Sequence, residues 1–128
     1  MYEKFGLFIN GDWIKSFQNG EVRSPVTEGV LGTVSMASPR DTVSAIDAAE
    51  RAMTDLRKMG GFERADALHR AADAMISRKS EAAHMISSET GKPIAQAERE
   101  WSLACDQFRW YAEEARRIYG RVVESRVP

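Results

Sequence analysis

The spacing of hydrophobic residues changes once along the chain, near Ser38. Before that point, short apolar runs alternate with turn residues, which is typical of strands. The pair Asn10-Gly11 separates Leu7-Phe8-Ile9 from Trp13-Ile14. Such a pair favours a tight hairpin because both residues tolerate a positive φ. We therefore expect residues 1–37 to form a small β region that opens with an antiparallel hairpin.

Two further features belong to this β region. A second turn is expected at Gln18-Asn19-Gly20, and Pro25 holds the following segment, Glu21-Val22-Arg23, out of helical conformation. The segment 29–34 begins with glycine and is rich in β-branched residues, so it predicts another strand.

A helix is expected to begin at Ser38. Ser38 is suited to cap the first turn, Pro39 fits the first helical position, and Asp41 suits the positive end of the helix dipole. Gly60-Gly61 ends this element. Hydrophobic residues at three- and four-residue spacing define one apolar face: Val43, Ile46, Ala49, Met53 and Leu56.

The next stretch predicts two more helices. A break is expected near Lys79, because Ser80 followed by Glu81 is typical of a new helix cap. Gly91 and Pro93 end the third helix, since Gly91 can adopt the left-handed conformation and Pro93 cannot continue a helix. The apolar side of the second helix comprises Ala65, Leu68, Ala72, Met75 and Ile76.

The last helix is expected from about Ala95 to Tyr119, with Gly120 as its end. The sequence then predicts a helical region over 38–119 and the start of a strand over 120–128. The chain is thus α+β, with an N-terminal antiparallel hairpin and strands followed by about four amphipathic helices. The apolar face of the last helix comprises Trp101, Ala104, Cys105, Phe108, Tyr111, Ala112, Ala115 and Ile118.

Charge and composition exclude some classes of function. The chain has 18 basic and 19 acidic residues, so it lacks the basic face that nucleic-acid binding requires. No apolar run approaches the ~20 residues of a membrane span, and the first residues do not form a secretory signal. A single cysteine, Cys105, fits a reducing compartment. We therefore expect a cytoplasmic protein that contacts neither nucleic acid nor membrane.

Several short motifs follow one another in a recognisable order. The hairpin segment 7–13 comes first, then Ser24-Pro25-Val26-Thr27, then Glu63-Arg64 at a helix start, and finally Glu89-Thr90-Gly91-Lys92-Pro93. Together they resemble the N-terminal region of the aldehyde dehydrogenase superfamily. Ser24 stands where the family usually has Asn, and Glu28-Gly29 inverts its common Gly-Glu order, so the turn there is expected to differ.

The segment 108–120 is similar to the succinate-semialdehyde dehydrogenase branch, in which a Trp, an Ala-Glu-Glu run and a closing Tyr-Gly recur. The resemblance implies an α/β parent in which residues 1–128 are the N-terminal part of the NAD(P)-binding domain and the helices pack on a parallel sheet. It also implies NAD or NADP as cofactor and oxidation of an aldehyde, succinate semialdehyde in this branch, through a cysteine thiohemiacetal and thioester. A homo-oligomer is expected, and this chain should self-associate through its exposed helix face.

No catalytic or cofactor-binding residue of that family is expected in this chain. The family's asparagine, glutamate and cysteine segments have no counterpart among the 128 residues, so the catalytic domain is absent and the chain alone should be inactive. Cys105 lies in an apolar helix stripe between Trp101 and Phe108, which indicates a buried, inert thiol rather than the nucleophile. An alternative is a stand-alone helical interaction module without catalysis.

One candidate site comes from the resemblance alone. Some family members bind a structural monovalent cation through an acidic residue at the position of Glu89 and through backbone carbonyls of the extended segment, here Val22 and Arg23. Oxygen ligands suit such a hard cation. The alternative is that Glu89 is a solvated carboxylate at a helix end near Lys92.

The remaining candidates are interpreted more simply. The family's last long helix borders the substrate tunnel, so Leu103 or Arg99 could line its mouth, although core or surface roles are the alternative. His69 and His84 have no cysteine or carboxylate partner at a useful spacing and are interpreted as structural or solvated. The three tryptophans are interpreted as packing anchors: Trp13, Trp101 and Trp110.

Overall fold

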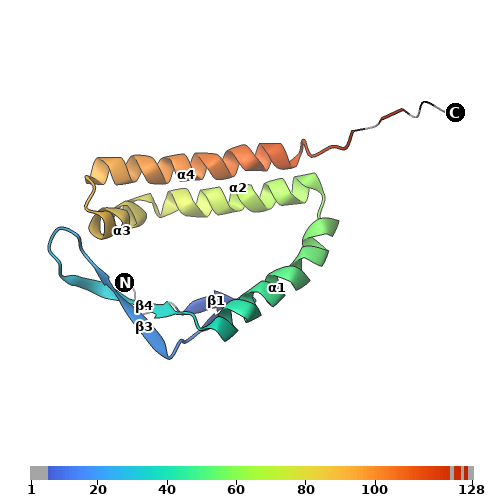
Figure 1. The fold of residues 1–128 in the computed structure, drawn as a ribbon. Helices are drawn as coiled ribbons and strands as arrows, with labels where there is room; N and C mark the ends of the chain where they lie inside the picture. The colour runs from blue at the N-terminus through green and yellow to red at the C-terminus, as the bar shows by residue number, and fades with distance from the viewer. Residues whose placement is uncertain (1–5, 122, 125, 127–128) are drawn as a thin grey trace.

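The computed structural model describes residues 6–121, 123, 124 and 126. In this part of the chain four strands precede four helices, which confirms the α+β expectation (Figure 1). The strands are β1 (Leu7–Ile9), β2 (Asp12–Ile14), β3 (Gln18–Arg23) and β4 (Val30–Met36). The helices are α1 (Pro39–Lys58), α2 (Gly61–Ser77), α3 (Lys79–Thr90) and α4 (Ile94–Ala115).

β1 and β2 form the predicted hairpin. They pair antiparallel, with Leu7 opposite Ile14 and Phe8 opposite Trp13. Asn10 and Gly11 have φ values of 55° and 88°, as a tight two-residue turn requires. The Asn-Gly signal therefore fixed both the position and the conformation of the turn.

β3 and β4 form a second, separate antiparallel pair. The turn expected at 18–20 is wrong, because β3 already begins at Gln18 and pairs Gln18 with Met36 and Gly20 with Val34. Neither Asn19 nor Gly20 has a positive φ. The partner strand β4 runs two residues further than the expected 29–34 segment. Residues 18–20 form a strand because they pair with β4, although their own sequence favours a turn.

The β3–β4 turn shows the effect of the two departures from the family pattern. Ser24 is buried, and its hydroxyl accepts hydrogen bonds from the backbone N–H groups of Val26 and Thr27, both at 3.3 Å. Glu28, not Gly29, adopts the left-handed conformation, with φ at 58°. Its N–H donates to the Ser24 carbonyl at 2.8 Å, so the turn closes around a residue that disfavours this conformation.

α1 begins with the predicted cap. The Ser38 hydroxyl accepts from the Asp41 N–H at 3.2 Å, and the Asp41 carboxylate accepts from the Ser38 N–H at 2.9 Å. The hydrogen bond from the Ser38 hydroxyl lowers the pKa of Asp41 most, and the hydrogen bond from the Ser38 backbone N–H lowers it further. A lowered pKa means that this cap stabilises the helix at neutral pH and weakens as the pH falls through the lowered value.

The break between α2 and α3 lies where the sequence predicts it, at Arg78, whose φ of −105° and ψ of 14° are not helical. The cap expected at Ser80 is wrong, because Ser80 already lies inside α3. Arg78 instead holds Glu81 through two hydrogen bonds of 3.0 and 3.1 Å. These bonds lower the pKa of Glu81 and raise that of Arg78.

α4 is shorter than expected. It ends at Ala115 rather than near Tyr119, and a turn follows at 116–117. Ile118 and Tyr119 are largely exposed, so no packing holds a further helical turn there. Residues 120, 121, 123, 124 and 126 are not in a strand, and the other positions of the expected strand, 122, 125, 127 and 128, lie outside the described residues.

The centre of the structure is the antiparallel pair of α2 and α4, which lie side by side, with α3 packed at one end (Figure 1). The buried residues of these helices are small, so the helix backbones approach closely. A Cβ on Gly61 would lie only 2.7 Å from the Ala115 carbonyl oxygen. The buried residues of α2, α3 and α4 are Ala65, Ala72, Ala83, Ala97, Cys105, Ala112 and Ala115.

The larger apolar side chains of the predicted faces are mostly exposed. In α1 the exposed fractions of Val43, Ile46, Met53 and Leu56 are 56%, 62%, 41% and 45%, and only Ala48 is buried. The accessible surface of the chain is 10362 Å², whereas a compact protein of 14.3 kDa exposes roughly 6,800 Å². Much apolar surface is therefore open. No helix in the described ranges is long and apolar enough to cross a membrane.

The turn between α3 and α4 lies against the turn between β3 and β4. Gly91 caps α3 with φ at 74°, as predicted. A Cβ at this position would lie 3.2 Å from Val26 Cγ2 and 3.3 Å from Pro25 Cγ. Two of the family-like motifs, far apart in sequence, thus meet in space.

Glu28→Gly should stabilise the chain. Glycine adopts a positive φ without the steric penalty that Glu28 carries, although it also adds freedom to the unfolded chain. The expected net gain in unfolding free energy is about 0.5–1 kcal/mol, measured by urea denaturation. The double variant Glu28→Gly/Gly29→Glu, which exchanges the two residues, should give a similar gain. A loss of stability in both variants would show that the positive φ of Glu28 does not strain the folded chain.

Gly91→Ala should destabilise the chain by about 1–2 kcal/mol, because alanine is disfavoured at this φ and its Cβ presses on Pro25 and Val26. Urea denaturation gives the value. The matched control is Gly120→Ala, where a Cβ meets no atom within 4 Å and φ is not positive, so its stability should be unchanged. Equal effects at both positions would contradict the account.

Candidate functional site

The three residues of the predicted cation site lie in two elements. Glu89 is exposed in the last turn of α3. Val22 is half-buried in β3 and pairs with Gly32, and Arg23 ends that strand. Gly91 lies so near Pro25 and Val26 that an added Cβ would touch both, so the α3 end and the β3 end are neighbours.

The backbone of the extended segment is irregular at the point the site would use. The register between β3 and β4 shifts between Val22 and Arg23. The Arg23 guanidinium donates to the Glu28 carbonyl at 3.0 Å and pairs with Glu21. Glu89 also has a contact within the chain. The donor set of one carboxylate and two carbonyls has the right chemistry for a monovalent cation.

The alternative for Glu89 is a solvated carboxylate near Lys92, and Lys92 has partners of its own. Lys92 Nζ forms an ion pair with Glu100 of α4, and the Lys92 carbonyl accepts from the Ser87 hydroxyl at 2.7 Å. The described residues contain no group of three or more His, Cys, Asp or Glu side chains that could hold a metal ion. Any cation here would therefore depend on backbone oxygens.

Cys105 lies where the sequence places it, in the core. Its side chain is fully buried in α4, and it is a free thiol. A thiolate must be accessible to attack a substrate, so this position suits packing rather than nucleophilic catalysis.

His69 has a carboxylate partner that sequence reasoning missed. Its Nε2 lies 3.1 Å from Glu113 Oε1, across the α2–α4 pair. Arg116 lies 3.7 Å from the other oxygen of Glu113, and Asp73 pairs with Arg109 at 3.3 Å one turn further along. The expectation that His69 has no such partner is wrong, because 44 residues separate the pair in sequence and only the helix packing joins them. This row of polar contacts is half-exposed and suits a structural role.

The other predicted packing residues divide into two groups. Trp101 is half-buried and its indole N–H donates to the Met75 carbonyl at 2.7 Å, so it anchors α4 to α2. Trp110 is exposed, which makes its interpretation as an anchor wrong within the described structure. Trp13 is also exposed and packs on the Phe8 ring, at 5.0 Å. His84 Nδ1 lies 2.8 Å from the Ser80 carbonyl of the preceding turn.

Leu103 and Arg99 both lie exposed on α4, four residues apart and hence on the same side of the helix. That side faces away from the buried residues Ala97, Cys105 and Ala112. The two residues are therefore free of the helix core, as a role at the mouth of a tunnel would require.

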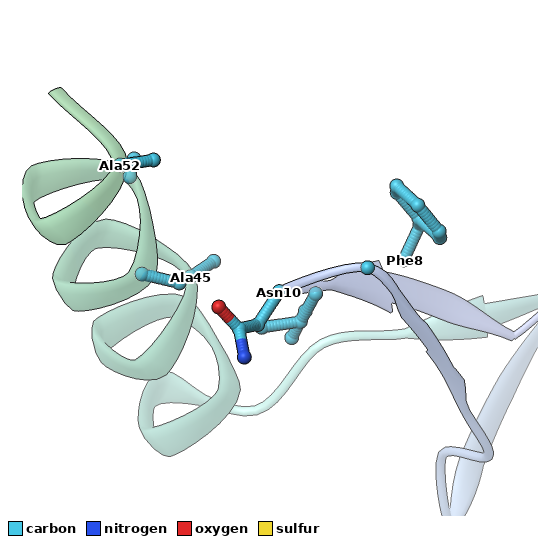
Figure 2. A pocket seen from close by; sticks show the side chains of 8 residues that line it. Phe8, Asn10, Ala45 and Ala52 are labelled. Atoms are coloured by element: carbon cyan, nitrogen blue, oxygen red, sulfur yellow. The ribbon is translucent and has the colours of Figure 1, made fainter. Parts of the chain in front are cut away.

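One cleft lies between the β1–β2 hairpin and α1 (Figure 2). Figure 2 shows Asn10 pointing toward α1 and the alanines of α1 forming the opposite wall. Its volume is 340 Å³, and it is open to solvent. Its lining is mainly apolar: Phe8, Ile9, Asn10, Gly11, Ala45, Ala48, Ala49 and Ala52.

The N-terminus of α1 is occupied by its own cap. A pyrophosphate site needs a glycine-rich turn that leads from a strand into a free helix N-terminus. The N–H groups at the start of α1 face the carboxylate of Asp41 and the hydroxyl of Ser38, which would repel or exclude a phosphate.

Comparison with known proteins places the chain. The model of the aldehyde dehydrogenase family matches residues 13–128. A glutarate-semialdehyde dehydrogenase of Pseudomonas putida is 36% identical over 124 residues, which cover 94% of this chain and 26% of that protein. The NADP-dependent succinate-semialdehyde dehydrogenase of Escherichia coli is 37% identical over 118 residues, which cover 90% of this chain and 24% of the enzyme.

Solved structures agree. The crystal structure of succinate-semialdehyde dehydrogenase from Burkholderia pseudomallei superimposes with a TM-score of 0.91 at 32% identity and covers 96% of this chain and 26% of that one. The chain spans about a quarter of the length of the relatives it matches. The order of motifs, the fold and the family match agree, and the chain belongs to the aldehyde dehydrogenase family.

Proposed function

We propose that this chain is the N-terminal part of the NAD(P)-binding domain of an enzyme that oxidises an aldehyde to a carboxylic acid with NAD or NADP. The observation that carries the proposal is the family match over residues 13–128, together with relatives named as NADP-dependent dehydrogenases. This match favours an enzyme over the alternative of a stand-alone helical module.

Succinate semialdehyde is the proposed substrate of the whole enzyme. Two similar relatives are named for semialdehydes, glutarate semialdehyde in one and succinate semialdehyde in the other. Both compounds carry a carboxylate at the end opposite the reacting carbon. Leu103 and Arg99 support this choice, because a leucine side chain can contact methylene groups and an arginine one turn away can bind a carboxylate.

The chain alone is proposed to be inactive. Oxidation through a thioester needs an accessible thiolate, and Cys105 is buried in the α2–α4 core. In the whole enzyme, the open apolar side of α1 is the surface proposed to meet the parallel nucleotide-binding sheet. The whole enzyme is further proposed to be a cytoplasmic homo-oligomer, in keeping with a single, reduced cysteine.

A chimera tests the enzyme proposal. The segment of the E. coli succinate-semialdehyde dehydrogenase that matches this chain is replaced by residues 1–128, and NADPH formation from succinate semialdehyde is measured. We expect turnover within about tenfold of the parent, because a segment of the same fold should restore the same packing. The isolated 1–128 chain should show no turnover.

The matched control is Cys105→Ala in the chimera. Because this thiol packs in the core, the variant should keep kcat/KM within about twofold while losing some stability. A folded chimera without activity would contradict the proposed function. A loss of activity in Cys105→Ala alone, at normal stability, would mean that this thiol has a catalytic role.

We also propose that Glu89 and the backbone carbonyls of Val22 and Arg23 hold a structural monovalent cation. The support is the close approach of Gly91 to Pro25 and Val26 and the register shift between Val22 and Arg23. Such an ion would join the end of α3 to the end of β3 through oxygen ligands.

Thermal melting of the chain in sodium or potassium chloride and in tetramethylammonium chloride, at equal ionic strength, tests the cation site. The small cations should raise the midpoint, and Glu89→Gln should remove the difference, because binding to the folded state alone stabilises it. Glu98→Gln, another exposed acidic residue, should keep the difference. Equal midpoints in all three salts would contradict the site.

A further inference from the structure

The chain contains the dipeptide Asn-Gly twice, as Asn10-Gly11 and as Asn19-Gly20. The first pair forms the two-residue turn between β1 and β2, whereas the second lies within β3. Both asparagine side chains are exposed, so exposure does not distinguish the two sites. They differ in backbone conformation, which contacts within this chain determine.

An asparagine that precedes glycine can lose its side-chain amide without an enzyme. The glycine backbone nitrogen gives up its proton to hydroxide and attacks Cγ of the asparagine. A nitrogen–carbon bond forms, the bond from Cγ to the amide nitrogen breaks, and ammonia leaves with a proton taken from water. Water then opens the five-membered imide at either carbonyl, which leaves aspartate or isoaspartate, and no oxidant or reductant is needed. Glycine favours the attack because no Cβ stands beside its nitrogen.

The two glycines differ in the space around them. A Cβ on Gly11 would meet no atom within 4 Å. A Cβ on Gly20 would lie 3.1 Å from Met36 Sδ and 4.0 Å from Val34 Cγ2. Side chains of β4 therefore enclose the backbone at Gly20, while the backbone at Gly11 is open for the ring to form.

The two strand pairs also differ in length. β1 and β2 share three residue pairs, whereas β3 and β4 share six, among them Asn19 with Ser35 and Gly20 with Val34. Rotation of Asn19 into the geometry of attack must break this longer pairing. A short two-stranded hairpin is only marginally stable and opens often, so Asn10 should reach that geometry more frequently.

We propose that Asn10 is a site of spontaneous deamidation, at which the turn residue becomes aspartate or isoaspartate, and that β3 protects Asn19 in the same dipeptide. The observation that carries the proposal is the contrast between an open turn and an enclosed, paired strand. The inference concerns the covalent stability of the chain and does not depend on the proposed enzymatic activity.

Deamidation at Asn10 would change how the hairpin packs on α1. Isoaspartate adds a methylene group to the backbone of the turn, and a tight two-residue turn cannot keep its geometry with that extra atom. Aspartate instead brings a negative charge to a side chain that points toward the alanines of α1 (Figure 2). An unpaired charge beside an apolar wall is unfavourable, so both products should loosen the hairpin from α1.

Incubation of the 128-residue chain at mildly alkaline pH tests the proposal, with peptide mapping by mass spectrometry to separate the asparagine, aspartate and isoaspartate forms. Deamidation should be at least about fivefold faster at Asn10 than at Asn19 in the folded chain. In denaturing urea the two rates should agree within about twofold, because both dipeptides are then free of the fold.

A variant that opens the hairpin gives a second measurement. Trp13 packs on Phe8 across β1 and β2, with ring centroids 5.0 Å apart. Trp13→Ala should therefore raise the rate at Asn10 by about threefold or more and leave Asn19 unchanged. Trp110→Ala, at an exposed tryptophan of α4, should change neither rate.

Equal rates at the two asparagines in the folded chain would overturn the proposal. A preference for Asn10 that persists in urea would also overturn it, because neighbouring residues and not the fold would then set the rates. Both outcomes are read from the unsubstituted chain, so the result stands even where Trp13→Ala fails to fold.

Discussion

The close approach of α2 and α4 is the constraint on which the other packing depends. Alanines and Cys105 fill this interface, and Gly61 allows the start of α2 to lie against the end of α4. Close approach brings His69 to Glu113 and Trp101 to Met75 across the pair. Alanine buries little apolar area, so the interface positions the helices well but contributes modest stability, and it leaves the larger side chains outside.

Local signals in the sequence were reliable where one short segment decides the geometry. Asn10-Gly11, the cap at Ser38 and the end of α3 at Gly91 were all predicted, because the conformation at each depends on a residue's own φ preference or on a bond to a residue three positions away. The helix break at Arg78 was also predicted, although its capping contact was not. The order of motifs that indicated the family depends on the same local features.

Features that depend on distant partners could not be predicted in this way. Gln18 to Gly20 join a strand because β4 is present to pair with them. The partner of His69 and the exposure of Trp110 follow from how α4 rotates against α2, which hydrophobic spacing alone does not fix. The candidate cation site was expected from the family resemblance alone, because three elements separate Val22 and Glu89 in the sequence. In the structure the close approach of the two turns makes these elements neighbours.

The burial of Cys105 has a practical consequence for the study of this chain. A thiol reagent can reach the sulfur only when α4 separates from its neighbours, so the rate of labelling reports how often that separation occurs. Because Cys105 is the single cysteine of the sequence, the absorbance change on labelling reports the separation of α4 alone. The labelling rate of Cys105 therefore measures how often the helix core opens.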